Sequence, residues 1–203
     1  MTWVKVCGLM DTVSVAAVVD GGADAAGFVL APGSPRHLSI AHAAELMAEV
    51  SVSCFIVTVD LSVEDAIAAA EATGADGIQA HGIHAASVAA VALDAGYLSL
   101  YPIAVSPGGL SESIRSVLPG AMPLLDTYSD DEHGGTGTSF DWSLIDEVGR
   151  PFVLAGGLGP ENVAAAITAV RPFGVDASSR LESSRGVKDP SRILDFIQEA
   201  KST

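Results

Sequence analysis

Two short apolar stretches in the second half of the chain each end in a group suited to chemistry. The stretch at 123–125 is followed by Asp126, and the stretch at 152–155 by Gly156 and Gly157. Active sites of parallel α/β folds lie at the carboxyl ends of strands. A carboxyl at the rim of an apolar barrel can have a raised pKa and act as a general acid, although an Asp-Thr pair is also a common turn cap. The tract predicts an enzyme that acts on a small phosphorylated substrate.

Cys7 ends another predicted strand, in which period-two alternation puts Lys5 and Cys7 on one side. A thiol at the carboxyl end of a strand is a candidate general base or nucleophile if a nearby cation favours its thiolate, and Lys5 is such a cation. The alternatives are a small core residue for Cys7 and a partner of a buried carboxylate for Lys5. The position of Cys7 favours function. Cys54 starts a strand and is expected to belong to the core.

Three turns have a composition suited to binding an anion. They are the GGTG tract with Gly134 and Gly135, the Gly156-Gly157 pair, and the Ser178-Ser179 pair, which is expected to open a short helix. In barrels the loops after strands seven and eight usually bind phosphate through backbone N–H groups. One glycine pair most often marks only a turn, but three such turns in these positions favour a phosphate site.

Arg36 and His81 are candidate substrate-binding residues. Arg36 lies in the loop APGSPRHLS, whose prolines stiffen the backbone and can hold the guanidinium for bidentate binding of a carboxylate; a solvated arginine is the alternative. His81 follows a strand and is either a substrate contact or a structural histidine, two readings of equal weight. The acids at 129–133 are contiguous, which is typical of a solvated loop, so no metal is expected.

The charge balance excludes several partners. The formal net charge is −15, which argues against nucleic acid and against an anionic membrane. Lys5 and Arg36 are the only lysine or arginine residues before residue 115, whereas Arg180, Arg185 and Lys188 lie within nine positions, so an anionic substrate meets positive groups in two places. The two cysteines give no disulfide framework and no zinc spacing. No signal peptide or membrane-spanning stretch is seen, so a cytoplasmic protein is expected.

Apolar stretches of strand length alternate with segments of helical period. Strands are predicted at 3–6, 25–30, 54–59, 77–80, 98–103, 123–125, 152–155 and 174–176, and helices at 12–20, 40–50, 62–72, 85–95, 110–117, 142–147, 160–169 and 190–201. This order predicts a single-domain (β/α)₈ barrel over residues 1–203, although such barrels usually have about 250 residues. The alternative is an open doubly wound sheet, whose GxGxxG fingerprint is absent after the first strand.

Together the motifs resemble those of the phosphoribosylanthranilate isomerase family of tryptophan biosynthesis. The matching stretches run from residue 4 to residue 190: VKVCG, GADAAGFVLAPGSPRHLS, QAHG, LLDT, GGTGTSFDW, LAGGLGPENV, and GVDASS with GVKDP. The resemblance implies a (β/α)₈ barrel and an Amadori rearrangement without a cofactor. The reaction would turn N-(5-phosphoribosyl)anthranilate into an open-chain 1-deoxyribulose phosphate.

The resemblance also implies roles for individual residues. Cys7 would be the general base that removes the sugar C2 proton, and Asp126 the general acid that protonates the ring oxygen. Arg36 would hold the anthranilate carboxylate, and Asp176 and His81 would line the sugar site. Ring opening needs a proton delivered to oxygen and enolamine formation needs one withdrawn from carbon, so two groups of opposed protonation state can do both.

The chain departs from the family pattern at two places. Arg180 stands where the family usually has glycine, and Thr138-Ser139 replaces a lysine inside the GGTG–FDW stretch. We expect Arg180 to contact the substrate phosphate.

Two other functions remain open from the sequence. One is a phosphosugar isomerase of wider range that also acts on a histidine-pathway aminoaldose; its substrate has two phosphates, and the few cations before residue 115 speak against a second anion site. The other is a non-catalytic barrel that binds a phosphate ligand, which would require neither Cys7 nor Asp126. Both a monomer and a homodimer are compatible with the sequence.

Overall fold

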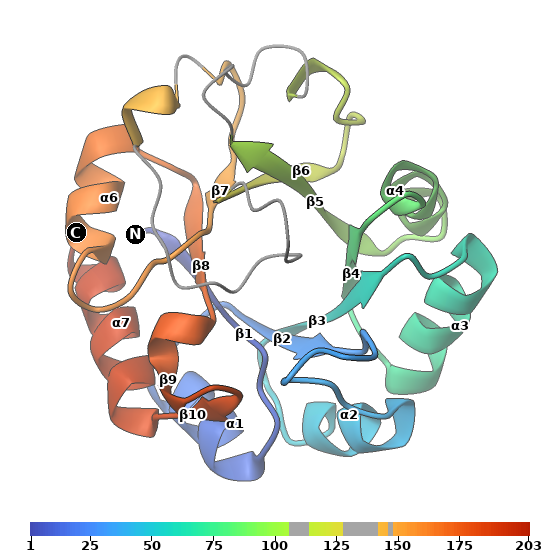
Figure 1. Cartoon of the computed structure of the whole chain (residues 1–203), viewed down its shortest axis with the longest axis horizontal. Helices are drawn as coiled ribbons and strands as arrows, with labels where there is room; N and C mark the ends of the chain where they lie inside the picture. Colours follow the sequence, from blue (N-terminus) through green and yellow to red (C-terminus); the bar gives the residue numbers. More distant parts are fainter. Residues whose placement is uncertain (106–113, 128–141, 146–147) are drawn as a thin grey trace.

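Eight parallel strands close into a barrel in chain order, with the helices packed around its outside (Figure 1). The computed structural model describes residues 1–105, 114–127, 142–145 and 148–203. The barrel strands are β1 (Trp3–Cys7), β2 (Ala25–Val29), β3 (Ser53–Val59), β4 (Gly77–His81), β5 (Leu98–Val105), β6 (Met122–Thr127), β7 (Val153–Leu154) and β8 (Gly174–Ala177). The predicted fold class, a single-domain (β/α)₈ barrel, is confirmed.

The helices follow the strands as the sequence pattern predicts. They are α1 (Thr12–Asp20), α2 (Ile40–Met47), α3 (Val63–Thr73), α4 (Ala85–Asp94), α6 (Val163–Val170) and α7 (Pro190–Ser202), with 3₁₀ turns η1 (Trp142–Leu144) and η2 (Ser179–Leu181). The predicted helix at 110–117 lies partly outside the described residues, and the one at 142–147 is described only as η1 and the residue after it.

Capping side chains set where several helices begin. Asp11 Oδ1 accepts a hydrogen bond from the backbone N of Ser14 at the start of α1. Asp189 Oδ1 accepts from Ser191 N at the start of α7, with Pro190 in the first turn, where no N–H is needed. Such caps satisfy backbone donors that would otherwise lack a partner.

Residues inside the barrel form layers. Near the amino ends of the strands the filling is apolar and includes Phe55, Leu100, Leu124 and Val153. Above them lies Lys5, which is completely buried. The outer faces of the strands pack against helices rich in alanine and valine, and those small side chains allow close helix–sheet packing. The barrel therefore has an apolar base and a polar upper half.

A short antiparallel hairpin follows β8 and η2. It consists of β9 (Glu182–Ser184) and β10 (Val187–Lys188), and its register sets Lys188 opposite Glu182. The sequence analysis missed it because its strands have three and two residues, too few to show an alternating apolar pattern. The hairpin lies beside the carboxyl end of β8 and becomes part of the site described below.

The apolar base predicts a measurable cost for added volume. A Cβ on Gly77 would lie 2.4 Å from Phe55 Cε1 and 2.9 Å from Leu98 Cβ. Gly77→Ala should lower the free energy of unfolding by roughly 1–3 kcal/mol, because the packed interior must shift. Urea denaturation measures this, with Glu71→Ala on exposed α3 surface as the control, expected within about 0.5 kcal/mol of the parent protein. A Gly77→Ala protein as stable as its parent would contradict this packing.

Candidate active site

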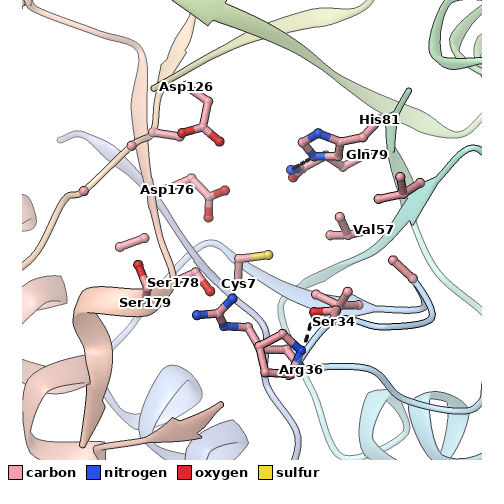
Figure 2. Close-up of a pocket in the computed structure, with 18 of the residues that line it drawn as sticks. Cys7, Ser34, Arg36, Val57, Gln79, His81, Asp126, Asp176, Ser178 and Ser179 are labelled. Atoms are coloured by element: carbon pink, nitrogen blue, oxygen red, sulfur yellow. Dashed lines mark hydrogen bonds between the residues drawn. The ribbon is translucent and has the colours of Figure 1, made fainter. Parts of the chain in front are cut away.

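A cavity of about 420 Å³ opens at the carboxyl ends of the strands. Figure 2 shows the side chains that surround it, with Asp126 on the side opposite Arg36 and Cys7 between them. Its lining includes Cys7, Ser34, Arg36, Gln79, His81, Asp126, Gly156, Gly157, Asp176, Ser178, Ser179 and Arg185. Groups from both ends of the chain therefore meet around one space large enough for a small ligand.

Most of the residues singled out in the sequence lie on this lining. The structure brings together Cys7, Asp126, Arg36, His81, Asp176, Gly156, Gly157, Ser178 and Ser179. Arg180 lies in η2, next to Ser179, and is not among the cavity-lining residues. Gly134, Gly135 and the acids at 129–133 lie outside the described residues.

Two lining residues were missed by the sequence analysis. Gln79 lies two positions before His81 in β4, so the same period-two argument that pairs Lys5 with Cys7 would have placed it inside the barrel. Arg185 was counted as a cation but given no role; it sits at the turn of the β9–β10 hairpin. That position depends on the hairpin, which the sequence pattern does not reveal.

Lys5 is the centre of a buried polar network beneath the cavity. Its Nζ donates to Asp176 Oδ2 and to Gln79 Oε1, both at 3.0 Å. Burial lowers the pKa of Lys5, but the Asp176 carboxylate and the Cys7 thiol outweigh that effect and hold it above its usual value. Lys5 therefore carries a positive charge inside the barrel.

Asp176 balances that charge only partly. Burial raises the pKa of its carboxyl, and the attraction of Lys5 opposes the rise without cancelling it. Its second oxygen, Oδ1, is buried and has no hydrogen-bond partner within the described part of the chain. A buried acceptor of this kind on a cavity wall is suited to a ligand hydroxyl.

Cys7 points into the cavity directly above Lys5 (Figure 2). Burial raises the pKa of the thiol, Asp176 adds to the rise, and the charges of Lys5 and Lys188 oppose it. The result is a pKa above the usual value, so the thiol is protonated near neutral pH in this structure. The ammonium groups still lower the cost of forming a thiolate relative to an apolar site.

Gln79 links Lys5 to His81. Because Gln79 Oε1 accepts from Lys5, the Gln79 amide nitrogen faces His81 Nε2, at 2.9 Å. An amide nitrogen only donates, so this network assigns an unprotonated Nε2 to His81, and the neutral ring carries its proton on Nδ1.

The wall near β7 and β8 is built from backbone. Gly156 and Gly157 have φ of 86° and 61°, a region that favours glycine. Asn162 fixes the loop, since its Nδ2 donates to Gly157 O at 3.0 Å and its Oδ1 accepts from Gly159 N at 2.9 Å. Ser178 precedes η2, and its carbonyl accepts from Lys188 Nζ at 2.9 Å. This wall can present N–H groups to an anion.

Two searches of the described residues gave no further site. Within the described ranges no three His, Cys, Asp or Glu side chains come close enough to hold a metal ion. None of the helices described is both long and apolar enough to cross a membrane.

Comparisons with known proteins agree with this geometry. The family model described as N-(5'phosphoribosyl)anthranilate (PRA) isomerase matches residues 4–199. The chain belongs to the phosphoribosylanthranilate isomerase family. It is 41% identical to the N-(5'-phosphoribosyl)anthranilate isomerase of Paracoccus denitrificans, an alignment that covers 97% of this chain and 96% of that protein.

Solved structures of the family have the same fold. The phosphoribosyl anthranilate isomerase of Thermotoga maritima is 33% identical, with full coverage of both chains and a TM-score of 0.89. A phosphoribosyl anthranilate isomerase in complex with reduced 1-(o-carboxyphenylamino)-1-deoxyribulose 5-phosphate is 32% identical, again with full coverage of both chains, at a TM-score of 0.85.

The electrostatics of the site predict different reactivities for the two thiols. Burial, with the nearby Asp76 carboxylate, raises the pKa of Cys54 to about 12. Lys5→Met removes the charge that most lowers the pKa of Cys7, so at about pH 8 the Cys7 thiolate fraction should fall and alkylation by iodoacetamide should slow. Peptide mass spectrometry measures both thiols in one sample, and Cys54 serves as the internal control. Equal Cys7 rates with and without Lys5 would contradict the assigned electrostatics.

Proposed function

We propose that this chain catalyses the Amadori rearrangement of N-(5-phosphoribosyl)anthranilate to 1-(2-carboxyphenylamino)-1-deoxyribulose 5-phosphate, in tryptophan biosynthesis. The observation that carries the proposal is that Cys7, from β1, and Asp126, from β6, line one cavity. The substrate is suited to that cavity because it is small, has an aromatic carboxylate at one end and a phosphate at the other, and needs proton transfer in between.

Two proton transfers make up the proposed mechanism. Asp126 donates a proton to the ring oxygen while the bond from C1 to that oxygen breaks, which leaves an iminium group at C1. Cys7, as thiolate, then takes the C2 proton, and the electrons of that C–H bond form the enolamine. Loss of the proton on the C2 hydroxyl and gain of one at C1 give the ketone. Hydrogen atoms only move within the substrate, so the reaction balances with acid–base groups.

Lys5 supports the base in this scheme. Removal of a carbon-bound proton needs the thiolate, which burial disfavours. The Lys5 ammonium beneath Cys7 stabilises the thiolate by charge, while the bond from Lys5 to Asp176 keeps that ammonium in place. The thiol and carboxyl can then hold opposite protonation states within one site.

The remaining lining residues bind the rest of the substrate. Arg36 binds the anthranilate carboxylate, and Asp176 and His81 contact the sugar. The phosphate binds to the glycine and serine turns and to Arg180, a set made up of Gly134, Gly135, Gly156, Gly157, Ser178, Ser179 and Arg180. The backbone wall with positive φ at Gly156 and Gly157 supports this arrangement.

Removal of either proton-transfer group should abolish turnover but spare binding. Cys7→Ala and Asp126→Asn should each lower kcat by roughly 10²–10⁴-fold, because general acid–base groups contribute about that much. Loss of anthranilate-adduct fluorescence measures kcat, and calorimetry with the reduced product analogue measures Kd. Cys54→Ala removes a thiol outside the cavity and is the matched control. A Cys7→Ala enzyme with normal kcat would rule out a catalytic thiol, and a non-catalytic binding barrel would show no turnover in the parent protein.

The role of Arg180 can be tested in the same assay. Arg180→Gly should raise KM for the phosphorylated substrate, because a charge-assisted contact with phosphate is lost. Arg171→Gly is the matched control: Arg171 is exposed at the end of α6 and has φ of 47°, a conformation glycine accepts easily. An unchanged or lower KM for Arg180→Gly would show that Arg180 does not bind the phosphate.

A further inference from the structure

The Arg36 guanidinium is held by a carboxylate of the protein itself. Arg36 Nε donates to Glu182 Oε1 at 2.6 Å and Arg36 Nη2 donates to Glu182 Oε2 at 3.1 Å, a bidentate pair. The Glu182 side chain is 4% exposed, so this ion pair is shielded from water. Bidentate arginine–carboxylate pairs fix orientation as well as charge.

Glu182 is in turn fixed by its own hairpin. Lys188, opposite it in the register, donates from Nζ to Glu182 Oε1 at 3.1 Å, and the backbone N of Gly186 donates to Oε2 at 2.9 Å. Each carboxylate oxygen thus accepts two hydrogen bonds. Burial raises the pKa of Glu182, but Arg36, Lys188 and the Gly186 N–H outweigh it and keep the pKa below its usual value. Glu182 stays ionised at neutral pH.

The rest of Arg36 is equally constrained. A Cβ on Gly8 would lie 2.5 Å from Arg36 Cδ, so the arginine stem lies directly on the residue that follows Cys7. A Cβ on Gly186 would lie 2.6 Å from the carbonyl oxygen of Pro35, which shows that the hairpin turn touches the Arg36 loop. Figure 2 shows the guanidinium between Cys7 and Ser178. The arginine therefore has little freedom to choose another orientation.

This arrangement leaves one edge of Arg36 for a ligand. Glu182 takes the side edge, formed by Nε and Nη2, and the end edge, formed by Nη1 and Nη2, remains for a second planar carboxylate. The cluster of Arg36, Lys188 and Glu182 carries two positive charges and one negative charge, so a net positive charge persists at the cavity wall. Without Lys188, Glu182 would neutralise the arginine on which an anionic group depends.

We propose that Glu182 is a positioning residue for recognition of the substrate's aromatic carboxylate: it orients Arg36 so that the end edge of the guanidinium faces the cavity. The proposal rests on the proposed function, in which Arg36 binds that carboxylate. Glu182 itself does not touch the substrate. It acts through Arg36, and Lys188 and the Gly186 N–H hold it in place.

The test compares two ligands in calorimetry. One is reduced 1-(o-carboxyphenylamino)-1-deoxyribulose 5-phosphate, and the other is the same molecule without its carboxyl group. Glu182→Gln should weaken the first by about tenfold and the second by less than about twofold, because only the first uses the oriented edge of Arg36. Glu45→Gln, the same chemical change on the exposed surface of α2, is the matched control and should alter neither.

Arg36→Ala separates this proposal from the proposed function. If Arg36→Ala weakens both ligands equally, or neither, the contact between Arg36 and the carboxylate is wrong. If Arg36→Ala is selective for the carboxylated ligand but Glu182→Gln weakens both equally, or neither, Glu182 is not a positioning residue. Tighter binding of the carboxylated ligand by Glu182→Gln would also overturn the proposal, because Glu182 would then compete with substrate for Arg36.

Two further variants complete the design. In Arg36→Ala/Glu182→Gln the loss should equal that of Arg36→Ala alone, since Glu182 acts only through the arginine. If Glu182→Gln fails to fold, Glu182→Asp keeps the charge but shortens the side chain by one methylene, and it should show the same selective loss. A Glu182→Asp protein that binds both ligands like the parent would overturn the proposal.

Discussion

The buried ammonium of Lys5 is the interaction on which the upper half of the barrel depends. It reaches from β1 to Gln79 on β4 and Asp176 on β8, both at 3.0 Å, and so ties together strands from both ends of the chain. An ion pair of this kind is weak evidence for stability, because desolvation offsets much of its attraction. Its consequence is electrostatic: Lys5 sets the charge beneath Cys7, while Gln79 transmits its orientation to His81. The chemistry of the site follows from this one charge.

The few cations of a strongly acidic chain gather around the same space. Of ten lysine and arginine residues in a protein of formal charge −15, Arg36 and Arg185 line the cavity, while Lys5 and Lys188 bond to residues that line it. The overall field repels anions, so the local field has to attract them. Net charge therefore gave the right exclusion of nucleic acid as an expected partner, while the position of individual cations carries the information about substrate.

The barrel and most of its lining were predictable from the sequence because both depend on local periodicity. Apolar runs marked all eight strands to within a few residues, and period-two alternation placed Lys5 and Cys7 on the inner face. The β9–β10 hairpin was not predictable, since its two strands are too short and polar to give a pattern. The pairing of Arg36 with Glu182 joins residues 146 positions apart, and only the closed barrel brings them together. The roles of individual site residues likewise remain proposals until they are tested.

The most direct test of the account is an experimental structure of this protein with the reduced product analogue bound. The account predicts that Cys7 Sγ and an Asp126 carboxylate oxygen approach the same pentose chain, with Asp126 within about 2.6–3.2 Å of the oxygen that closes the ring in the substrate and Cys7 facing C2. It also predicts that the Lys5–Asp176 pair is unchanged. An analogue whose sugar lies beyond reach of either residue, with its aromatic ring away from Arg36, would contradict the account.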